Sequence, residues 1–318
     1  MKTPIGGYYE LELNNTGLYH QGGIYLNTGR NCLEYIIRAK KYRKIYIPYY
    51  TCSVILEPLE KLNVEYQFYN IDSKLDPIIN FSINKDEAFL YTNYFGLKQK
   101  TVEVLAEKLS NLIIDNAQAF FCPPLPCIDT FYSPRKFFGI PDGGILFTNS
   151  LLNIYIPTAK SIDRLSHLFL RIEENAEYGY NHFKTNDQAL NNLPIQYMSR
   201  ITDKILSNID YKHALNIRNR NFKFLHEKLG CRNKFHFDQN SCKHGPMVYP
   251  FWTENHELRE ILIKQNIYIA KYWPNVTLWT NPSFIEYILT EYVVPLPVDQ
   301  RYEKQHMELI IGIINKYG

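Results

Sequence analysis

The sequence lacks the features that mark several large classes of protein. None of its apolar runs approaches the roughly 18 residues of a membrane span. The opening MKTPIGGYYELELNN contains no apolar core of a secretory signal. Six unevenly spaced cysteines in 318 residues are too few for a disulfide scaffold. We therefore expect a soluble, cytoplasmic protein with reduced cysteines and no membrane partner.

Charge and motif content exclude further classes. The chain has 35 Lys and Arg against 32 Asp and Glu, a net charge of +3, without long runs of one sign. A nucleic-acid binder would concentrate its basic residues in a patch or stripe, so no nucleic-acid partner is expected. The signatures G-x-G-x-x-G, G-x-x-x-x-G-K-[ST], H-E-x-x-H and G-x-S-x-G are all missing. No metal site is expected, because Cys231, His236, Cys242 and His244 fit none of the usual zinc-ligand spacings.

The first two-thirds of the chain alternates apolar runs with helical patterns. Residues 29–41 and 101–110 carry apolar side chains at helical spacing. Runs rich in β-branched and aromatic residues predict strands at 44–50, 64–71, 88–95, 111–117 and 143–149. This alternation predicts an α/β fold with a mostly parallel central sheet and helices on both faces. Such sheets bind ligands at the carboxyl ends of their strands.

The pattern changes from about residue 160, where helical periodicity dominates and extends through 200–229. A strand at 246–252, a helix at 255–266 and a closing helix at 303–317 follow. We place a boundary near Asp210. The predicted domains are a large α/β domain, 1–209, and a small α+β domain, 210–318, each of ordinary domain size.

Three segments carry groups that could form a ligand site. NTGRNCL (27–33) opens a helix, and the unpaired amides of a helix N-terminus suit a phosphate. LIIDNAQ (112–118) ends a strand with Asp115, which could pair with a protonated ring nitrogen or simply cap the next helix. FYSPRKFFGIPDGGILFTN (131–149) places Lys136 on a turn rich in proline and glycine. Taken singly, these are an ordinary helix cap, a capping carboxylate and a solvated lysine.

The order and spacing of these segments resemble the DegT/DnrJ/StrS aminotransferase family. Its members use pyridoxal 5′-phosphate (PLP) and have the aspartate-aminotransferase fold, fold type I. The family pattern Ser-Phe-x-Pro-x-Lys followed by Gly-Asp-Gly-Gly is similar to SPRK (133–136) and PDGG (141–144). IPYYTC (47–52), YFG (94–96) and VVPLPV (293–298) match further family segments in the same order. The resemblance runs from about residue 24 to 314.

This resemblance implies a role for each matching residue. Lys136 would bind PLP covalently and move the substrate proton, and Asp115 would pair with the pyridine nitrogen; these are the expected catalytic residues. Gln118 would lie near the phenolic oxygen. The expected phosphate ligands are Thr28, Gly29 and the amides of Arg30 and Asn31.

The chain departs from the family pattern at three of the expected cofactor-binding positions. Cys52 occupies the position at which the family usually has an aromatic residue that stacks on the cofactor ring. Ser133 is expected to take over a phosphate contact, because the usual serine five residues before the lysine is Phe131. Asn181, in a segment faintly similar to an Asn-Tyr-Arg motif, would reach the phosphate in the partner subunit.

The resemblance therefore implies a homodimeric aminotransferase. It would move an amino group from a donor such as glutamate to a keto sugar, nucleotide-linked in many relatives, in polysaccharide or surface-glycan biosynthesis. Two alternatives stay open: an acceptor that is a non-sugar carbonyl compound, and an inactive homologue that binds PLP or a sugar as a regulator. A related sugar dehydratase is disfavoured, because those enzymes replace the lysine by histidine.

Overall fold

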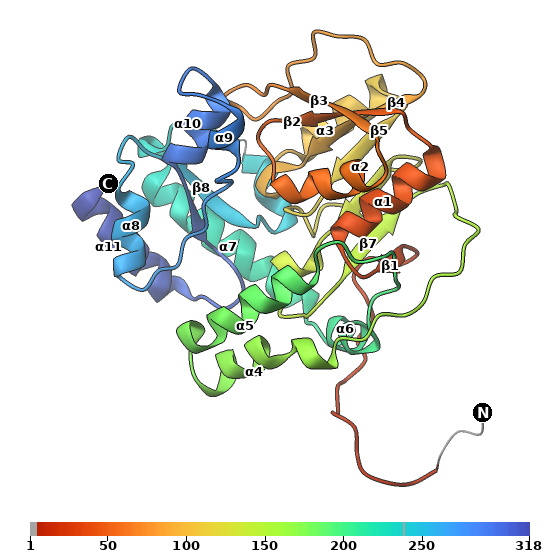
Figure 1. The fold of residues 1–318 in the computed structure, drawn as a ribbon. Helices are drawn as coiled ribbons and strands as arrows, with labels where there is room; N and C mark the ends of the chain where they lie inside the picture. The colour runs from red at the N-terminus through yellow and green to blue at the C-terminus, as the bar shows by residue number, and fades with distance from the viewer. Residues whose placement is uncertain (1–4, 238) are drawn as a thin grey trace.

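A seven-stranded sheet forms the centre of the computed structural model, which describes residues 5–237 and 239–318 (Figure 1). The strands lie in the order β1-β7-β6-β5-β4-β2-β3. Their bounds are β1 Ile24–Leu26, β2 Lys44–Pro48, β3 Glu65–Tyr69, β4 Glu87–Thr92, β5 Leu112–Asp115, β6 Asp129–Tyr132 and β7 Gly144–Phe147. Neighbouring strands are parallel except where they pair with β7. The mostly parallel sheet expected from the sequence is confirmed.

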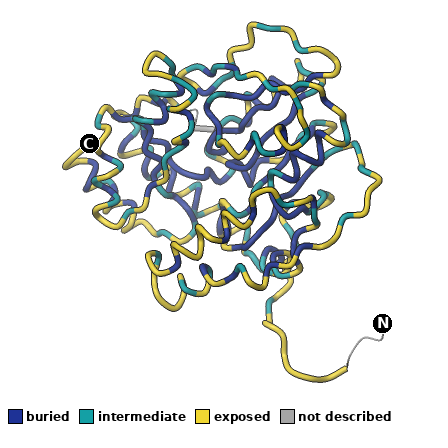
Figure 2. The backbone as a smooth tube through the Cα atoms, in the orientation of Figure 1, coloured by how far each residue is buried: buried dark blue, intermediate teal, exposed yellow. Residues whose placement is uncertain are grey.

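Both faces of this sheet are buried. Helices α1 (Gly29–Lys40) and α2 (Leu56–Lys61) cover one face, and α3 (Gln99–Lys108) covers the other. Along β4, Ala88 and Leu90 belong to the core that contains α1, whereas Phe89 and Tyr91 belong to the core that contains α3. Figure 2 shows the buried strands at the centre and exposed backbone around them. A strand covered on both faces shows no polar alternation, which explains the run of buried, mainly apolar residues at 88–91.

The C-terminal part builds on a second, antiparallel sheet of β8 (Val248–Trp252) and β9 (Val293–Pro297). Helices α7 and α11 lie against one another, and α7 also contacts β8. The helices of this part are α7 Tyr211–Leu229, α8 Leu258–Lys264, α9 Val276–Trp279, α10 Ile285–Tyr292 and α11 Lys304–Tyr317. The α+β character expected for this part is confirmed.

The helical stretch expected over 200–229 is broken in two. It consists of α6 (Arg200–Leu206) and α7, with a turn between them. The Asp210 carboxylate accepts a hydrogen bond from the His213 amide at 2.8 Å and so caps the first turn of α7. The proposed division into domains 1–209 and 210–318 coincides with this helix start and stays a prediction.

Helices α4 (Ser166–Glu173) and α5 (Ala176–Ala189) form an antiparallel pair at the edge of the molecule (Figure 1). Nearly all of α5 is exposed, and residues 5–15 extend away from the body.

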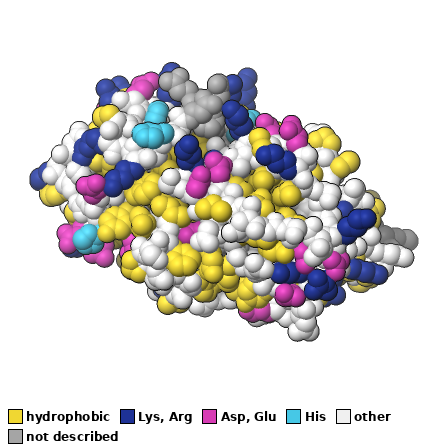
Figure 3. All heavy atoms as spheres, turned by 90° about the horizontal axis from the view of Figure 1, so that it is seen from above, with side chains coloured by type: hydrophobic (Ala, Val, Ile, Leu, Met, Phe, Trp, Pro, Cys, Tyr) yellow, Lys and Arg dark blue, Asp and Glu magenta, His cyan; other side chains and the backbone are white. Residues whose placement is uncertain are grey.

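Figure 3 shows acidic and basic side chains interspersed on one face of the molecule. Within the described ranges, no helix is long and apolar enough to cross a membrane.

Gly144 sets how closely α1 approaches the sheet. Its partner across the β1–β7 pair is Leu26, just before the start of α1. A Cβ atom on Gly144 would collide with the Thr28 carbonyl and lie 2.8 Å from the Cys32 sulfur. The helix can therefore reach this position only because residue 144 has no side chain.

We expect the Gly144→Ala variant to lose about 1–3 kcal/mol of unfolding free energy, because backbone atoms of α1 must move to admit the methyl group. Gly312→Ala is the matched control, since a Cβ there meets nothing within 4 Å in an exposed part of α11. That change should stabilise the protein by roughly 0.5–1 kcal/mol. Urea unfolding measures both; a neutral Gly144→Ala variant would contradict the packing argument.

Candidate active site

Four segments that carry candidate residues leave the sheet at one edge. Thr28 follows β1, Cys52 follows β2, Asp115 ends β5 and the Lys136 turn follows β6. These strands all run in the same direction, because each parallel pair preserves it and β7 reverses it twice between β6 and β1. The four segments thus share the carboxyl edge of the sheet, where α/β proteins bind their ligands.

The start of α1 provides an anion-binding group at this edge. The Thr28 hydroxyl accepts a hydrogen bond from the Asn31 amide at 3.1 Å and donates one to the Asn31 side-chain oxygen at 2.6 Å. The amides of Gly29 and Arg30 have no hydrogen-bond acceptor within the described part of the chain. They lie at the positive end of the helix dipole, so a phosphate would be stabilised there. A Cβ atom on Gly29 would lie 3.7 Å from the Ser133 Cβ, which places Ser133 beside these amides.

Asp115 and Lys136 form the charged centre of the site. Asp115 is buried, and one of its oxygens accepts a hydrogen bond from the Ala117 amide at 2.8 Å. Burial raises the pKa of Asp115, and the positive charge of Lys136 and the Ala117 hydrogen bond lower it in part. Lys136 is exposed at the end of a short 3₁₀ turn, Pro134–Lys136, whose last amide donates to the Ser133 carbonyl at 3.1 Å. A buried carboxylate in this position favours a cationic partner.

Several buried polar atoms at the same edge lack a hydrogen-bond partner among the described residues. Gln118 is fully buried; its oxygen accepts from the Phe95 amide at 3.0 Å, and its nitrogen has no acceptor. The Tyr50 hydroxyl, after β2, and the Thr92 hydroxyl, at the end of β4, are also unpaired. Because buried polar groups are normally hydrogen-bonded, this edge presents donors and acceptors suited to a polar ligand.

The loop that carries Cys52 is fastened to the C-terminal part of the chain. The Asn275 side chain donates to the Thr51 carbonyl at 2.9 Å and accepts from the Ser53 amide at 3.3 Å. Cys52 is half-buried and lies near Tyr272. One wall of the site is therefore contributed by residues 272–275.

A buried arginine, Arg218, lies behind the lysine turn. The Arg218 guanidinium, from α7, donates to the Pro246 carbonyl at 3.1 Å and the Met247 carbonyl at 3.2 Å. It also lies 4.5 Å from the centre of the Phe137 ring and donates to the Phe137 carbonyl at 3.5 Å. Burial lowers the pKa of Arg218 to about 10. Arg218 therefore ties the residue after Lys136 to the C-terminal part, and no local pattern around it signals this role.

Asn181 is carried by α5 and not by a segment that follows a strand. It is exposed on α5, and its carbonyl accepts a hydrogen bond from the Thr185 hydroxyl at 3.0 Å. Its expected contact with a partner subunit stays a prediction.

Across residues 5–237 and 239–318, no group of three or more His, Cys, Asp and Glu side chains could hold a metal ion.

The comparisons with known proteins identify the fold. No family model matches the sequence, and no curated protein matches it. A DegT/DnrJ/EryC1/StrS aminotransferase from Brucella abortus is 18% identical, with a TM-score of 0.63 over 95% of this chain and 87% of that one. The sugar aminotransferase CalS13 from Micromonospora echinospora is 13% identical, with a TM-score of 0.63 over 92% of this chain and 87% of that one. Spr1654 from Streptococcus pneumoniae, in its PLP form, is 14% identical, with a TM-score of 0.63 over 93% and 88%. This chain therefore has the fold of the DegT/DnrJ/StrS aminotransferases, which confirms the fold implied by its motifs.

Proposed function

We propose that this protein is a PLP-dependent aminotransferase. The observation that carries the proposal is the placement of buried Asp115 beside exposed Lys136, at the sheet edge where α1 begins. Each polar group of this edge is chemically suited to one polar part of PLP. The Gly29 and Arg30 amides with Ser133 suit its phosphate, the unpaired Gln118 nitrogen suits its phenolic oxygen, and Asp115 suits its ring nitrogen. The PLP form of the structural neighbour Spr1654 supports the same cofactor here.

The roles of the residues follow from their chemistry. When bound, PLP supplies an electron sink for the carbanion that forms as the substrate loses a proton. The Asp115 carboxylate keeps a proton on the ring nitrogen, because its negative charge stabilises the cation in a buried setting. The Lys136 amine, once free, would act as general base toward the proton on the substrate carbon and then as general acid. Arg218 and Gln300 hold the Phe137 carbonyl, at 3.5 and 2.9 Å, and so limit the movement of the turn that carries Lys136.

The acceptor in this proposal is a keto sugar, nucleotide-linked, and the donor is an amino acid such as glutamate. Structural neighbours described as sugar aminotransferases support the sugar. Arg218, which contacts the lysine turn from the C-terminal part, is fully engaged with carbonyls and Gln300, which leaves it unsuited to clamp a ketoacid carboxylate. Tyr272, half-buried near Cys52, is an aromatic residue of the kind that packs against sugar rings. The corresponding role is cytoplasmic, in polysaccharide or surface-glycan biosynthesis.

We also propose a homodimer as the working form. Large apolar side chains are exposed on the α4–α5 pair, where they would be buried by a second copy: Phe169, Ile172, Tyr178, Tyr180 and Phe183. A soluble monomer rarely leaves such side chains together in water. An isologous pair would bury the same patch on both copies.

Reduction of the PLP-loaded protein with borohydride should place a stable adduct on Lys136, found by peptide mapping. Lys136→Ala should abolish the adduct, whereas Lys108→Ala, an exposed lysine of α3, should leave it unchanged. The visible spectrum of the loaded protein should shift when glutamate is added. A colourless protein or an adduct on another lysine contradicts the proposal. An adduct at Lys136 with no response to any amino donor favours the inactive, regulatory alternative.

The Asp115→Asn variant should bind PLP but transaminate roughly a hundredfold or more slowly, because an amide cannot stabilise a protonated ring nitrogen. The α1 amides still hold the phosphate in this variant. Cofactor affinity is measured by absorbance titration and the rate by single-turnover kinetics. Asp163→Asn, on the exposed turn before α4, serves as the control. Transamination at the unmodified rate would refute the ring-nitrogen role.

The amino-loaded protein should be discharged faster by nucleotide-linked keto sugars than by ketoacids other than the product of the donor. The measurement is the return of the PLP spectrum with each acceptor of a panel. Faster discharge by such a ketoacid would overturn the sugar acceptor and favour a non-sugar carbonyl substrate, while leaving the aminotransferase proposal in place.

A further inference from the structure

Two arginines gather beside the start of α1. Arg30 belongs to its first turn, and Arg135 directly precedes Lys136. Both are largely buried, with side chains 11% and 15% exposed. Burial lowers the pKa of Arg135, and the nearby charge of Arg30 lowers it further, although Asp187 raises it. Burial also lowers the pKa of His167, with a further contribution from the charge of Arg135. The charge of Asp142 also raises the pKa of Arg135, so the two arginines and their neighbouring carboxylates lie close together.

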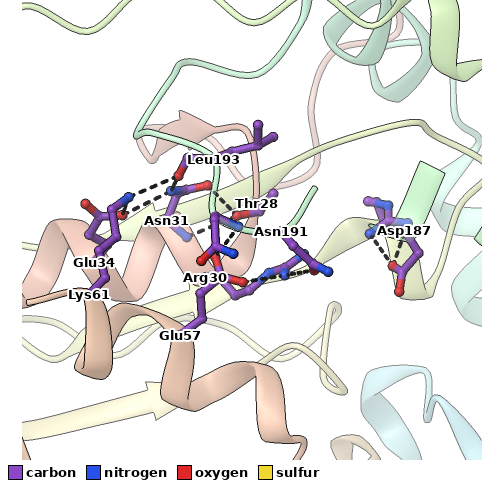
Figure 4. Close-up of polar contacts among 11 residues, drawn as sticks. Thr28, Arg30, Asn31, Glu34, Glu57, Lys61, Asp187, Asn191 and Leu193 are labelled. Atoms are coloured by element: carbon purple, nitrogen blue, oxygen red, sulfur yellow. Dashed lines mark hydrogen bonds and ion pairs between the residues drawn. The ribbon is translucent and has the colours of Figure 1, made fainter. Parts of the chain in front are cut away.

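The two guanidinium groups are held by different kinds of partner, and Figure 4 shows Arg30 with its partners Glu57 and Asn191. Arg30 forms an ion pair with Glu57 at 2.8 Å and donates to the Asn191 side-chain oxygen at 2.6 Å. Arg135 contacts a single oxygen of Asp187, at 3.2 Å from each terminal nitrogen, and its Nε has no acceptor among the described residues. The Asp187 side chain is 58% exposed. A mostly buried guanidinium is thus balanced by a solvated carboxylate that uses one oxygen, which is a weak arrangement.

Asp187 and Asn191 belong to a segment, 187–193, that lies across the start of α1. We call this segment the strap. Its Asn192 amide donates to Glu57 at 2.9 Å, and its Leu193 carbonyl accepts from the Asn31 side chain at 2.9 Å. Figure 4 shows Asn191 and Leu193 next to Thr28 and Asn31. Except for Leu190 and half-buried Leu193, the strap is exposed, so polar contacts rather than apolar burial hold most of it in place.

We propose that Arg135 and Arg30 form a phosphate-binding site that the strap covers until the phosphate arrives. The phosphate oxygens take the place of Asp187 on Arg135 and of Asn191 on Arg30, while Glu57 remains with Arg30. Guanidinium groups bind phosphate through paired hydrogen bonds, and the adjacent helix start adds favourable potential. The phosphate belongs either to PLP or to the diphosphate of a nucleotide-linked sugar; the inference rests on the proposed function for these two sources.

The test compares ligands that differ in phosphate. Arg135→Gln should weaken binding of PLP, or of uridine diphosphate, by roughly tenfold to a hundredfold, the range expected for a hydrogen bond to a charged group. Pyridoxal, which lacks the phosphate, should bind as before and so report that the site is still folded. Weaker PLP binding identifies the cofactor as the source, and weaker nucleotide binding identifies the substrate. Unchanged affinity for both phosphate ligands overturns the proposal. Arg171→Gln, exposed on α4, is the matched control.

Asp187→Asn tests the strap. Removing the competing carboxylate should tighten binding of the same phosphate ligand severalfold without changing the affinity for pyridoxal. A loss of affinity as large as that of Arg135→Gln would mean that the ion pair is structural, and would overturn the exchange. Calorimetry with inorganic phosphate separates this site from the proposed function. Phosphate binding that depends on Arg135, in a protein without any adduct on Lys136, would refute the aminotransferase and leave the site standing.

Discussion

The approach of α1 to the sheet at Gly144 is the contact on which the arrangement of the site depends. With no side chain at that position, the Thr28 carbonyl lies against β7, and the helix begins directly at the carboxyl edge. The same approach brings Gly29 beside Ser133, so the anion-binding amides and the lysine turn face one another. A helix start displaced by one methyl group would separate the proposed phosphate site from the proposed catalytic residues. The close packing of the α1 backbone on the β7 backbone therefore determines where the α1 amides lie relative to the Lys136 turn.

Few of the charged side chains at this edge form an ion pair with a buried side chain of opposite charge. Asp115 is buried beside an exposed lysine, and Arg218 is buried with carbonyl and amide partners, with the charge of Asp299 nearby. Arg135 relies on a solvated aspartate. Isolated buried charges are costly, and proteins retain them where a ligand or a reaction makes use of them. Each of these groups borders the turn around Lys136. The unfavourable free energy of burying charge is therefore greatest around the proposed catalytic centre.

The candidate residues show which parts of a site a sequence can indicate. Thr28, Asp115 and Lys136 were recognisable because each stands at a fixed place relative to an apolar strand, and parallel strands bring such places together. Arg135 belongs to the same motif as Lys136, yet its environment depends on Asp187, which lies 52 residues later. The contact of Asn181 with a partner subunit is likewise beyond a single chain and stays a prediction.

The sequence alone determined the α/β class, most strands of the central sheet and the order of the site segments, because apolar periodicity and turn residues act over a few neighbours. It did not reveal β1, β6 or the break between α6 and α7. Only the tertiary structure decided that Arg218 meets the carbonyl of Phe137, 81 residues earlier, and that the strap lies over α1. Such contacts depend on how whole elements pack against one another, and no local pattern specifies which distant side chain will fill the space that the packing leaves.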